Sequence, residues 1–330
     1  MLRTLRTALL VTVAVLLCTP TLSNAQDLGG ELQNLGEVYA DGYVQPLTDA
    51  IGSDLNGGLF RTADVGDGFL PGLPVDVYLG VSVSGALLSD ENDQFIFDGE
   101  QITSGGRTLN VTTTSPNNEV PTVFGDTDPN GELVFRDAQT GIEVERAPVP
   151  SALVNTSIAP LPVPQVGLGS IAGTDVQVRY LPETDISDYG SVGLTGVAVR
   201  HDLDQWVPAP LPFNLAAQGA WNQITIDDSD DSEVMDASGW AVNVQASKGV
   251  PALPLVLYGG VQYERFDVDY NYTFEGPNGG TNEISLSQDA TTSTRGLAGL
   301  SLTLAIIRIN VDYAVTNGNN VVTGGFGLRL

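Results

Sequence analysis

Hydrophobic and polar residues alternate strictly over many short segments in the second half of the chain. In residues 307–315, apolar residues occupy every second position and alternate with Arg308, Asn310 and Asp312. The segments "FNLAAQGAW", "WAVNVQAS" and "LVLYGGVQYE" show the same period of two. Successive side chains of a β-strand point to opposite faces, so this alternation predicts strands with one apolar and one polar face.

Two kinds of connection join the predicted strands. Short connections such as 172–174 and 251–254 alternate along the chain with acidic ones such as 181–190 and 227–236. Transmembrane β-barrels have short turns at one membrane face and longer loops at the other, and aromatic residues at both interfaces. Five aromatic residues lie near predicted strand ends: Tyr180, Trp221, Tyr258, Tyr263 and Tyr313. The pattern favours a membrane barrel over a soluble sandwich.

The number of strands follows from the same pattern. We predict nine strands between residue 163 and the last residue, a further strand at 74–88, and two less regular ones at 93–103 and 57–64. An even number of strands places both termini on one side of the membrane. We therefore expect an all-β, antiparallel transmembrane β-barrel of about 12 strands, with 10 or 14 as alternatives.

The first 25 residues have the features of an export signal. Arg3 and Arg6 precede an apolar run that is too short to span a bilayer, and small residues end at Ala25. Cys18 follows the bulky Leu17, which argues against a lipoprotein signal. We expect cleavage after Ala25 and localisation in a bacterial outer membrane.

Residues 31–55 follow a helical period instead. An apolar stripe interrupted by Gly36, Gly42 and Pro46 predicts two short helices. The stripe consists of Leu32, Leu35, Val38, Tyr39, Tyr43, Leu47 and Ile51. We expect residues 26–56 to form a plug or periplasmic element that starts at the periplasmic mouth. The barrel would then occupy residues 57–330, with an outer-loop excursion at 104–162.

Charge excludes one class of partner. The chain has 13 basic and 40 acidic residues, a formal net charge of −27. Nucleic acid is not an expected partner, because its phosphates would be repelled. The single cysteine lies in the predicted signal, so the mature chain has no disulfide.

Several motifs together carry a family resemblance. They are "YVQPLTDAIGSDLNGG", "VPTVFGD", "LPVPQVGLG" and the block "RYLPETD" followed by "GSVGLTGVAVRHDLDQWVP". They resemble an uncharacterised family of Gram-negative outer-membrane β-barrels, itself distantly similar to long-chain fatty-acid transporters. The final "NVVTGGFGLRL" resembles the strand by which such barrels are recognised for insertion. The resemblance implies a barrel in outer-membrane lipid, assembled by the barrel-assembly machinery, and carries no catalytic residues.

His201 is the only histidine of the chain. A hydrolase would need a serine and an acid to converge on it, and the sequence has no "GxSxG" elbow. We expect no catalytic residue and no cofactor. The stretch around His201 instead predicts a periplasmic turn motif, which consists of Arg200, His201, Asp202, Asp204 and Trp206.

A calcium-loop spacing occurs in "DTDPNGELVFRD", at Asp126, Asp128, Asn130 and Asp137. Its flanks are not helical, and "DPNG" is also an ordinary turn. We therefore expect no metal site, and calcium is kept as an alternative.

Six charged residues fall on the polar phase of predicted strands and would face the lumen: Arg179, Glu264, Arg295, Arg308, Asp312 and Arg329. Buried charges must be paired, so they would brace a narrow barrel or attract anions. The function expected is a channel, transporter or binder of small molecules, including hydrophobic ones. The alternatives are a structural or adhesive surface barrel with a closed, salt-bridged lumen, and an outer-membrane hydrolase that uses His201.

Overall fold

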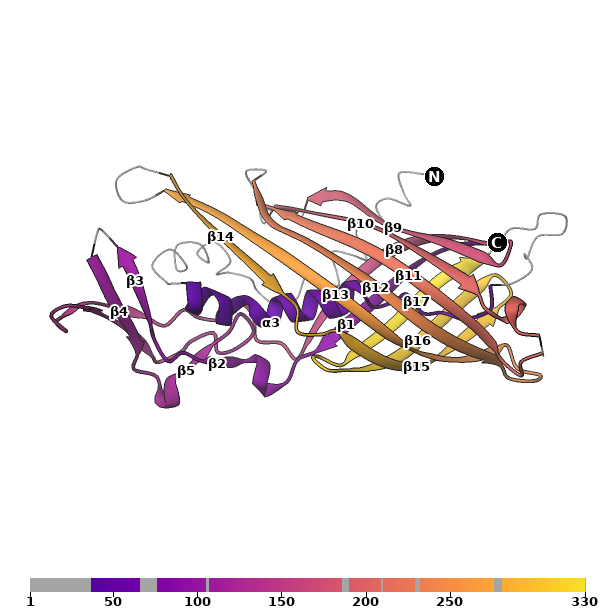
Figure 1. Cartoon of the computed structure of the whole chain (residues 1–330), viewed down its shortest axis with the longest axis horizontal. Coiled ribbons are helices and arrows are strands. Elements are labelled where there is room, and N and C mark those ends of the chain that lie inside the picture. The colour runs from indigo at the N-terminus through magenta and orange to yellow at the C-terminus, as the bar shows by residue number, and fades with distance from the viewer. Residues whose placement is uncertain are drawn as a thin grey trace.

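A closed antiparallel ring of ten strands forms the body of the protein (Figure 1). The computed structural model describes residues 37–65, 76–104, 107–185, 190–208, 210–228, 232–275 and 281–329. The ring strands are β1 (Asp76–Leu87), β8 (Ile158–Ile171), β9 (Thr174–Asp185), β10 (Ser191–Asp202), β11 (Asn214–Asp227), β12 (Glu233–Gly249), β13 (Leu255–Glu275), β15 (Thr294–Leu304), β16 (Ile307–Thr316) and β17 (Val321–Arg329). The first and last strands close the ring, with Tyr78 opposite Arg329 and Ala86 opposite Val321.

The two ends of the ring differ in their connections. At one end, which we call the turn end, the strands are joined by residues 172–173, 203–213, 250–254 and 305–306. Ala172 and Gly173 both have positive φ (51° and 70°), as a tight two-residue hairpin turn requires. At the other end, the loop end, the strands are joined by residues 88–157, 186–190, 228–232, 276–293 and 317–320. The connection 203–213 contains a short 3₁₀ turn, η5 (Asp204–Trp206).

The strand number is ten, and the expectation of about 12 was wrong. The candidate 57–64 forms no strand and joins no sheet: the chain bends at Gly58, Arg61 and Ala63, and residues 57–63 are buried inside the ring. The candidate 93–103 contributes β2 (Gln94–Ile96) and part of β3 (Glu100–Ser104), both outside the ring. Local alternation shows that a segment is extended, whereas ring membership depends on a lateral partner distant in the sequence.

One expected strand, 285–303, is divided into two. β14 (Thr281–Asp289) pairs with residues 267–275 of β13, and β15 pairs with residues 255–263. Between them, Asp49 of the N-terminal helix accepts hydrogen bonds from the backbone N–H (2.7 Å) and hydroxyl (2.9 Å) of Thr291. The break in the strand therefore coincides with a helix contact that takes a backbone donor out of the sheet.

The connection between β1 and β8 forms a small β-domain, residues 88–157, which we call the loop-end domain. A four-stranded sheet contains β3, β4 (Arg107–Thr113), β6 (Glu132–Asp137) and β7 (Glu143–Pro148), and β2 pairs with β5 (Glu119–Pro121). Two 3₁₀ turns, η2 (Asp90–Asn92) and η3 (Pro116–Asn118), precede β2 and β5. Its core includes Phe97, Val111 and Phe135 and is continuous with Tyr39 and Tyr43 of the N-terminal helix.

Within the described part of the expected helical region, residues 37–55 form one continuous helix, α3 (Glu37–Leu55), so the expectation of two short helices interrupted at Gly42 and Pro46 was wrong. It continues through Pro46, which is itself buried, because tertiary packing compensates for the local cost of proline. At Gly42 a Cβ would lie 2.4 Å from the ring of Phe95, so glycine permits the contact with β2. Leu32 and Leu35 of the expected stripe, and Gly36, which was expected to interrupt it, lie outside the described residues.

The helix runs from the loop end towards the turn end, as Figure 1 shows. Near its start, the ring of Tyr39 lies 5.2 Å from that of Phe95 and 5.1 Å from that of Phe97 in the loop-end domain. Its last residue, Leu55, packs against inward residues of the ring. The helix therefore enters the ring from the loop end, whereas we expected it to start at the mouth where β1 begins, which is the turn end. In the described part of the chain, no helix has the length and hydropathy of a membrane span.

Candidate functional site

Near the turn end, each ring strand presents apolar side chains outward and polar ones inward. On β16, Ile309, Val311 and Tyr313 are 44–48% exposed, whereas Asn310 and Asp312 are 4% and 6% exposed. Exposed valines on β9, β10, β12 and β13 extend this outer surface around the ring, and we call it the apolar band. Such a surface would be costly in water and suits lipid.

Farther towards the loop end, the two faces exchange character. Beyond Tyr263 on β13, the outward residues are Arg265, Asp267 and Asp269, and the buried inward ones are Phe266 and Val268. The exchange follows a row of aromatic residues: Tyr180, Trp221, Trp240 and Tyr263. Trp221 pairs with Trp240, whose ring lies 5.6 Å from that of Tyr263. The aromatic row therefore marks one edge of the apolar band, as an interfacial girdle does.

Residues 37–65, which we call the internal segment, run from the loop-end domain into the interior of the ring. Every residue from Gly52 to Ala63 is buried. Phe60 lies against β12 and β13 at Gly260, and the backbone N–H of Ala63 donates to the Ser247 hydroxyl (2.9 Å). The internal segment thus contacts inward side chains along the length of the ring.

Two arginines hold the last turn of α3. Arg179 donates to the carbonyl oxygens of Leu55 and Gly57 (2.8 Å for Gly57) and to Oδ1 of Asn222 (3.0 Å). Arg295 donates to the carbonyl oxygen of Ser53 (2.7 Å). The last carbonyls of a helix lack internal partners and carry the negative end of its dipole, so cations are favoured there. α3 has no basic residue in its own last turn, and the ring supplies the arginines.

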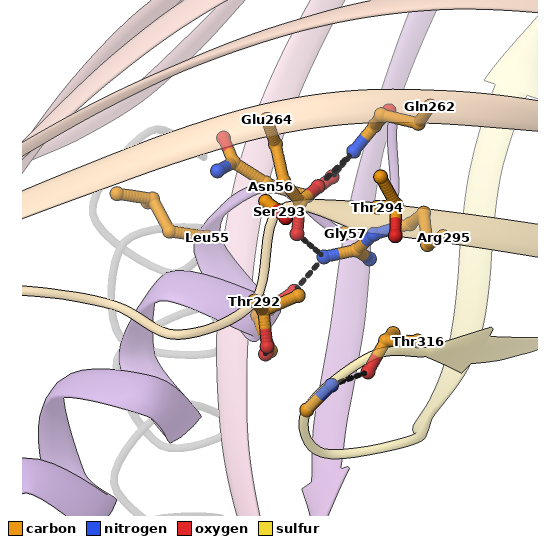
Figure 2. Close-up of polar contacts among 12 residues, drawn as sticks. Leu55, Asn56, Gly57, Gln262, Glu264, Thr292, Ser293, Thr294, Arg295 and Thr316 are labelled. Carbon is orange, nitrogen blue, oxygen red and sulfur yellow. Dashed lines mark hydrogen bonds and ion pairs between the residues drawn. The ribbon is translucent and has the colours of Figure 1, made fainter.

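A carboxylate and an amide complete this arrangement, as Figure 2 shows. Glu264 forms an ion pair with Arg295 (2.6 Å) and accepts a hydrogen bond from Gln262. Gln262 also donates to the carbonyl oxygen of Asn56 (3.1 Å). We call this set the inner clamp; it consists of Arg179, Asn222, Gln262, Glu264 and Arg295. Its chemistry fixes the internal segment, because each member bonds the segment or another member.

A second charged group lies at the turn end. Arg200 pairs with Asp175 and donates to the carbonyl of Thr62, and Arg329 pairs with Asp76 (2.7 Å). The guanidinium carbon of Arg61 lies 4.0 Å from the ring centre of Tyr78, a cation–π contact. Arg308 is 9% exposed and lies in the same group. We call this set the arginine cluster; it consists of Arg61, Arg200, Arg308, Arg329, Asp76, Asp175 and Tyr78.

The six residues expected in the lumen lie at inward positions in two separate groups and one pair. Arg179, Glu264 and Arg295 belong to the inner clamp, and Arg308 and Arg329 to the arginine cluster. Asp312 instead accepts a hydrogen bond from the hydroxyl of Tyr258 (2.8 Å).

Sequence reasoning missed several partners. Asn222, Gln262, Asp175 and Arg61 were not singled out. Asn222, Gln262 and Asp175 occupy polar positions in the alternating patterns of β11, β13 and β9, and this position could have identified them as inward residues. Arg61 precedes the first strand and gives no periodic signal.

The expected turn motif does not act as one unit. Arg200 lies two residues before the end of β10, at a buried inward position in phase with Ala198, whereas Asp204 and Trp206 belong to the turn that follows. The two ring nitrogens of His201 lie 2.9 Å from Thr174 Oγ1 and 2.8 Å from Gln205 Nε2, and the rings of His201 and Trp206 are 5.0 Å apart.

The two aspartates of this motif organise the connection from β10 to β11. Asp202 accepts from the N–H of Asp204 (2.8 Å), and Asp204 accepts from the N–H of Leu215 (2.9 Å). Burial raises the pKa of the Asp204 carboxyl above its usual value.

The calcium candidates do not converge. Asp137 accepts hydrogen bonds from the backbone N–H groups of Gln139 (3.0 Å) and Thr140 (2.8 Å), which close its own turn. The bonds from Thr140 hold the pKa of Asp137 below its usual value. Asp126 accepts from the N–H of Asp128 (2.9 Å). Within the described ranges, no three His, Cys, Asp or Glu residues are grouped as a metal site requires.

The described residues also line two hollows, one on the ring and one on the loop-end domain. A groove of about 930 Å³ crosses β11 to β16 and is lined largely by apolar groups, including Val244, Val261 and Val315. A second, of about 700 Å³, lies on the loop-end domain beside Asp93, Glu119 and Asp126.

Comparison with solved structures gives outer-membrane β-barrels. The translocator domain of the autotransporter NalP from Neisseria meningitidis is 12% identical and matches 88% of this chain and 95% of its own, with a TM-score of 0.28. OmpT of Vibrio cholerae, lacking loop L8, is 12% identical over 78% of this chain and 99% of its own, with a TM-score of 0.25. Ail of Yersinia pestis is 10% identical over 78% and 97%, with a TM-score of 0.20. At these TM-scores the matches carry no argument about function, and the likeness to long-chain fatty-acid transporters stays a prediction.

No curated protein matches the sequence. A family model, however, spans almost the whole chain, from residue 3 to residue 330. The chain therefore belongs to the family of unknown function DUF6588.

Proposed function

We propose that the protein is an outer-membrane barrel that is closed by its own internal segment and holds the loop-end domain above the membrane. The observation that carries this proposal is the buried run from Gly52 to Ala63, bonded to the inner clamp and to Arg200. A ring filled by its own chain leaves no continuous path between its ends. The protein then serves as an anchor for a surface domain.

The apolar band supports the membrane placement. From Leu255 to Tyr263, β13 covers eight residue steps, roughly 26 Å along the strand at about 3.3 Å per step. At the usual strand tilt of about 40° this is roughly 20 Å along the barrel axis, somewhat less than the apolar band of about 25 Å in outer-membrane barrels. Beyond Tyr263 the outer face is charged, so the loop-end half of the ring would stand in water. β17 closes the ring against β1, which supports the expected role of the last strand in assembly.

Epitope insertion tests this placement. Gly141 lies in an exposed turn where a Cβ would meet no atom within 4 Å, so it should tolerate a short epitope. Leu253, 59% exposed at the turn end, gives the matched control. Antibody should bind intact cells that carry the epitope at Gly141, and should bind the Leu253 form only after the outer membrane is opened. Equal accessibility of both, or the reverse order, would contradict the proposal.

The expected role as a channel or transporter requires a further step. A solute could cross only after the internal segment leaves the ring and exposes the inward polar residues. Liposome swelling with small neutral solutes distinguishes the two functions, since the closed barrel should admit none. Uptake by the unmodified full chain would favour the channel.

The hydrolase alternative rests on His201. Its contacts with Thr174 and Gln205 engage both ring nitrogens and support a structural role. His201→Gln should therefore leave folding nearly unchanged, because glutamine keeps a donor and an acceptor at this position. Loss of an esterase activity in this variant would revive the catalytic role.

A further inference from the structure

Six members of the arginine cluster have a buried polar atom without a hydrogen-bond partner among the described residues, and three of these atoms are Nε of Arg200, Nε of Arg329 and Oδ1 of Asp76. Nε and Nη1 of Arg61 and Nε of Arg308 are buried and have no hydrogen-bond partner among the described residues. The hydroxyl of Tyr78 is in the same state. A buried donor without an acceptor costs free energy, and in native proteins it usually marks a water or ion bound between the groups.

The charges around these donors do not balance. Four arginines, Arg61, Arg200, Arg308 and Arg329, line one cavity with three aspartates, Asp64, Asp76 and Asp175. Arg200 pairs with Asp175 and Arg329 pairs with Asp76, whereas no ion pair is formed by Arg61 or Arg308 in the described part of the chain. Among the described residues, the lining of the cavity therefore carries an excess of positive charge inside a strongly acidic protein. A neutral water would satisfy the donors but would leave this charge uncompensated.

The size of the cavity restricts what can fill it. Its volume is about 20 Å³, enough for one water-sized particle. A phosphate, a sulfate or a carboxylate-bearing ligand is larger, whereas a chloride ion is only slightly larger than water. We propose that the cavity between Arg61, Arg308 and Tyr78 is a binding site for a single chloride ion.

The position of the site gives the ion a structural consequence. The residues come from five ring strands near the turn end, namely β1, β9, β10, β16 and β17, and from the internal segment. An anion there bonds Arg61 of the internal segment and Arg308 of the ring at once. Chloride thus joins the internal segment to the ring at the end opposite to the loop-end domain.

Anion exchange tests this site in the full chain purified in detergent. Sodium gluconate is replaced stepwise by sodium chloride at constant ionic strength, and the unfolding temperature is recorded. A ligand that binds the folded state raises that temperature in a saturable manner. Arg308→Gln should weaken the apparent affinity for chloride about tenfold or more, because it removes a charged donor. Arg107→Gln, an exposed arginine of β4, should leave the affinity unchanged.

Bromide in crystals supplies an independent test. Bromide should replace chloride and give an anomalous-scattering peak between Arg61 and Arg308, which decides the question even if Arg308→Gln fails to fold. Tyr78→Phe, which removes only a hydroxyl, should lower the affinity less than Arg308→Gln. The proposal is overturned by an equal chloride response in Arg308→Gln and the unmodified chain, by a cavity that holds only water, or by a saturable response to sulfate and none to chloride.

Discussion

The two halves of the ring interior are held by different forces. In the half towards the loop end, Leu55 packs against an apolar cluster of inward residues that includes Leu194, Ile224, Phe266 and Val268. In the half towards the turn end, many inward residues are arginine, aspartate, glutamine and asparagine, several of which bond backbone carbonyls of the internal segment. A smaller apolar cluster lies among them and contains Leu59, Phe60, Ala198, Ala220, Ala241 and Tyr258. If the internal segment left the ring, the half towards the loop end would expose apolar surface to water. The half towards the turn end would expose mainly polar groups, which water can solvate. The internal segment is therefore retained mainly by its apolar part and positioned by its polar part.

The largest effect is expected from the apolar half. Phe266 is 2% exposed, and its ring lies where a Cβ on Gly52 of α3 would come within 2.8 Å. Phe266→Ala should lower the free energy of unfolding by about 3–5 kcal/mol, because it leaves a cavity against the helix. Urea unfolding followed by tryptophan fluorescence measures this loss. Val261→Ala, at an outward position on the same strand, should cost far less, and a similar cost for both would break the comparison.

An arginine on the outer face of the ring should be tolerated in the half towards the loop end but not in the apolar band. Val311 lies outward at the middle of the apolar band, and Asp269 lies outward beyond the aromatic row. In lipid vesicles, Val311→Arg should destabilise folding by about 2–4 kcal/mol, the usual cost of arginine at the bilayer midplane. Asp269→Arg, on a surface in water, should change it by about 0.5 kcal/mol or less. Equal costs would place the membrane boundary elsewhere.

The polar half should respond to loss of a single donor. Arg179→Gln leaves the carbonyls of Leu55 and Gly57 without their charged donor, at a cost of about 1–3 kcal/mol each. Arg146→Gln, at an exposed ion pair of the loop-end domain, is the control and should cost far less, because solvent screens an exposed ion pair. Hydrogen exchange at residues 53–57 should also rise in Arg179→Gln. Unchanged exchange there would show that the inner clamp does not position the helix end.

The smallest effect is expected when the pH is lowered. Hydrogen bonds from Thr140 lower the pKa of Asp137, and Arg146 lowers that of Glu143. A carboxyl whose folded pKa is depressed stabilises the fold above its unfolded pKa, and this contribution is lost as pH falls through the folded pKa. Proteolysis of the loop-end domain should therefore increase below about pH 4, before the ring unfolds. Asp137→Asn should flatten this dependence, and an unaltered acid profile would exclude its role.

The same two halves explain what the sequence could and could not predict. Near the turn end, the alternation of residues such as Ile309 and Asn310 is regular, and strand positions and inward arginines followed from it. Beyond Tyr263 both inward and outward residues change type, so the pattern still indicates strands but no longer indicates which face is buried. The break at 290–293 depends on Asp49 of α3, a contact that no local period contains.

The internal segment was the harder part to predict. Its apolar stripe indicated a helix that needs a partner, but Pro46 and Gly42 argued for an interruption that tertiary packing overrides. The direction of the helix could not follow from the sequence, since either end could enter the ring. Arg61 has no periodic context, and its place beside Tyr78 arises from the path of the chain through the ring.

Single-channel recording in planar bilayers tests the closed barrel most directly. The unmodified full chain should insert and show almost no stepwise conductance, because the internal segment fills the ring. The double variant Arg179→Gln and Arg295→Gln, which loses the donors to Ser53, Leu55 and Gly57, should show frequent openings. Stable, long-lived conductance in the unmodified chain, equal to that of the double variant, would contradict a barrel closed by its own internal segment.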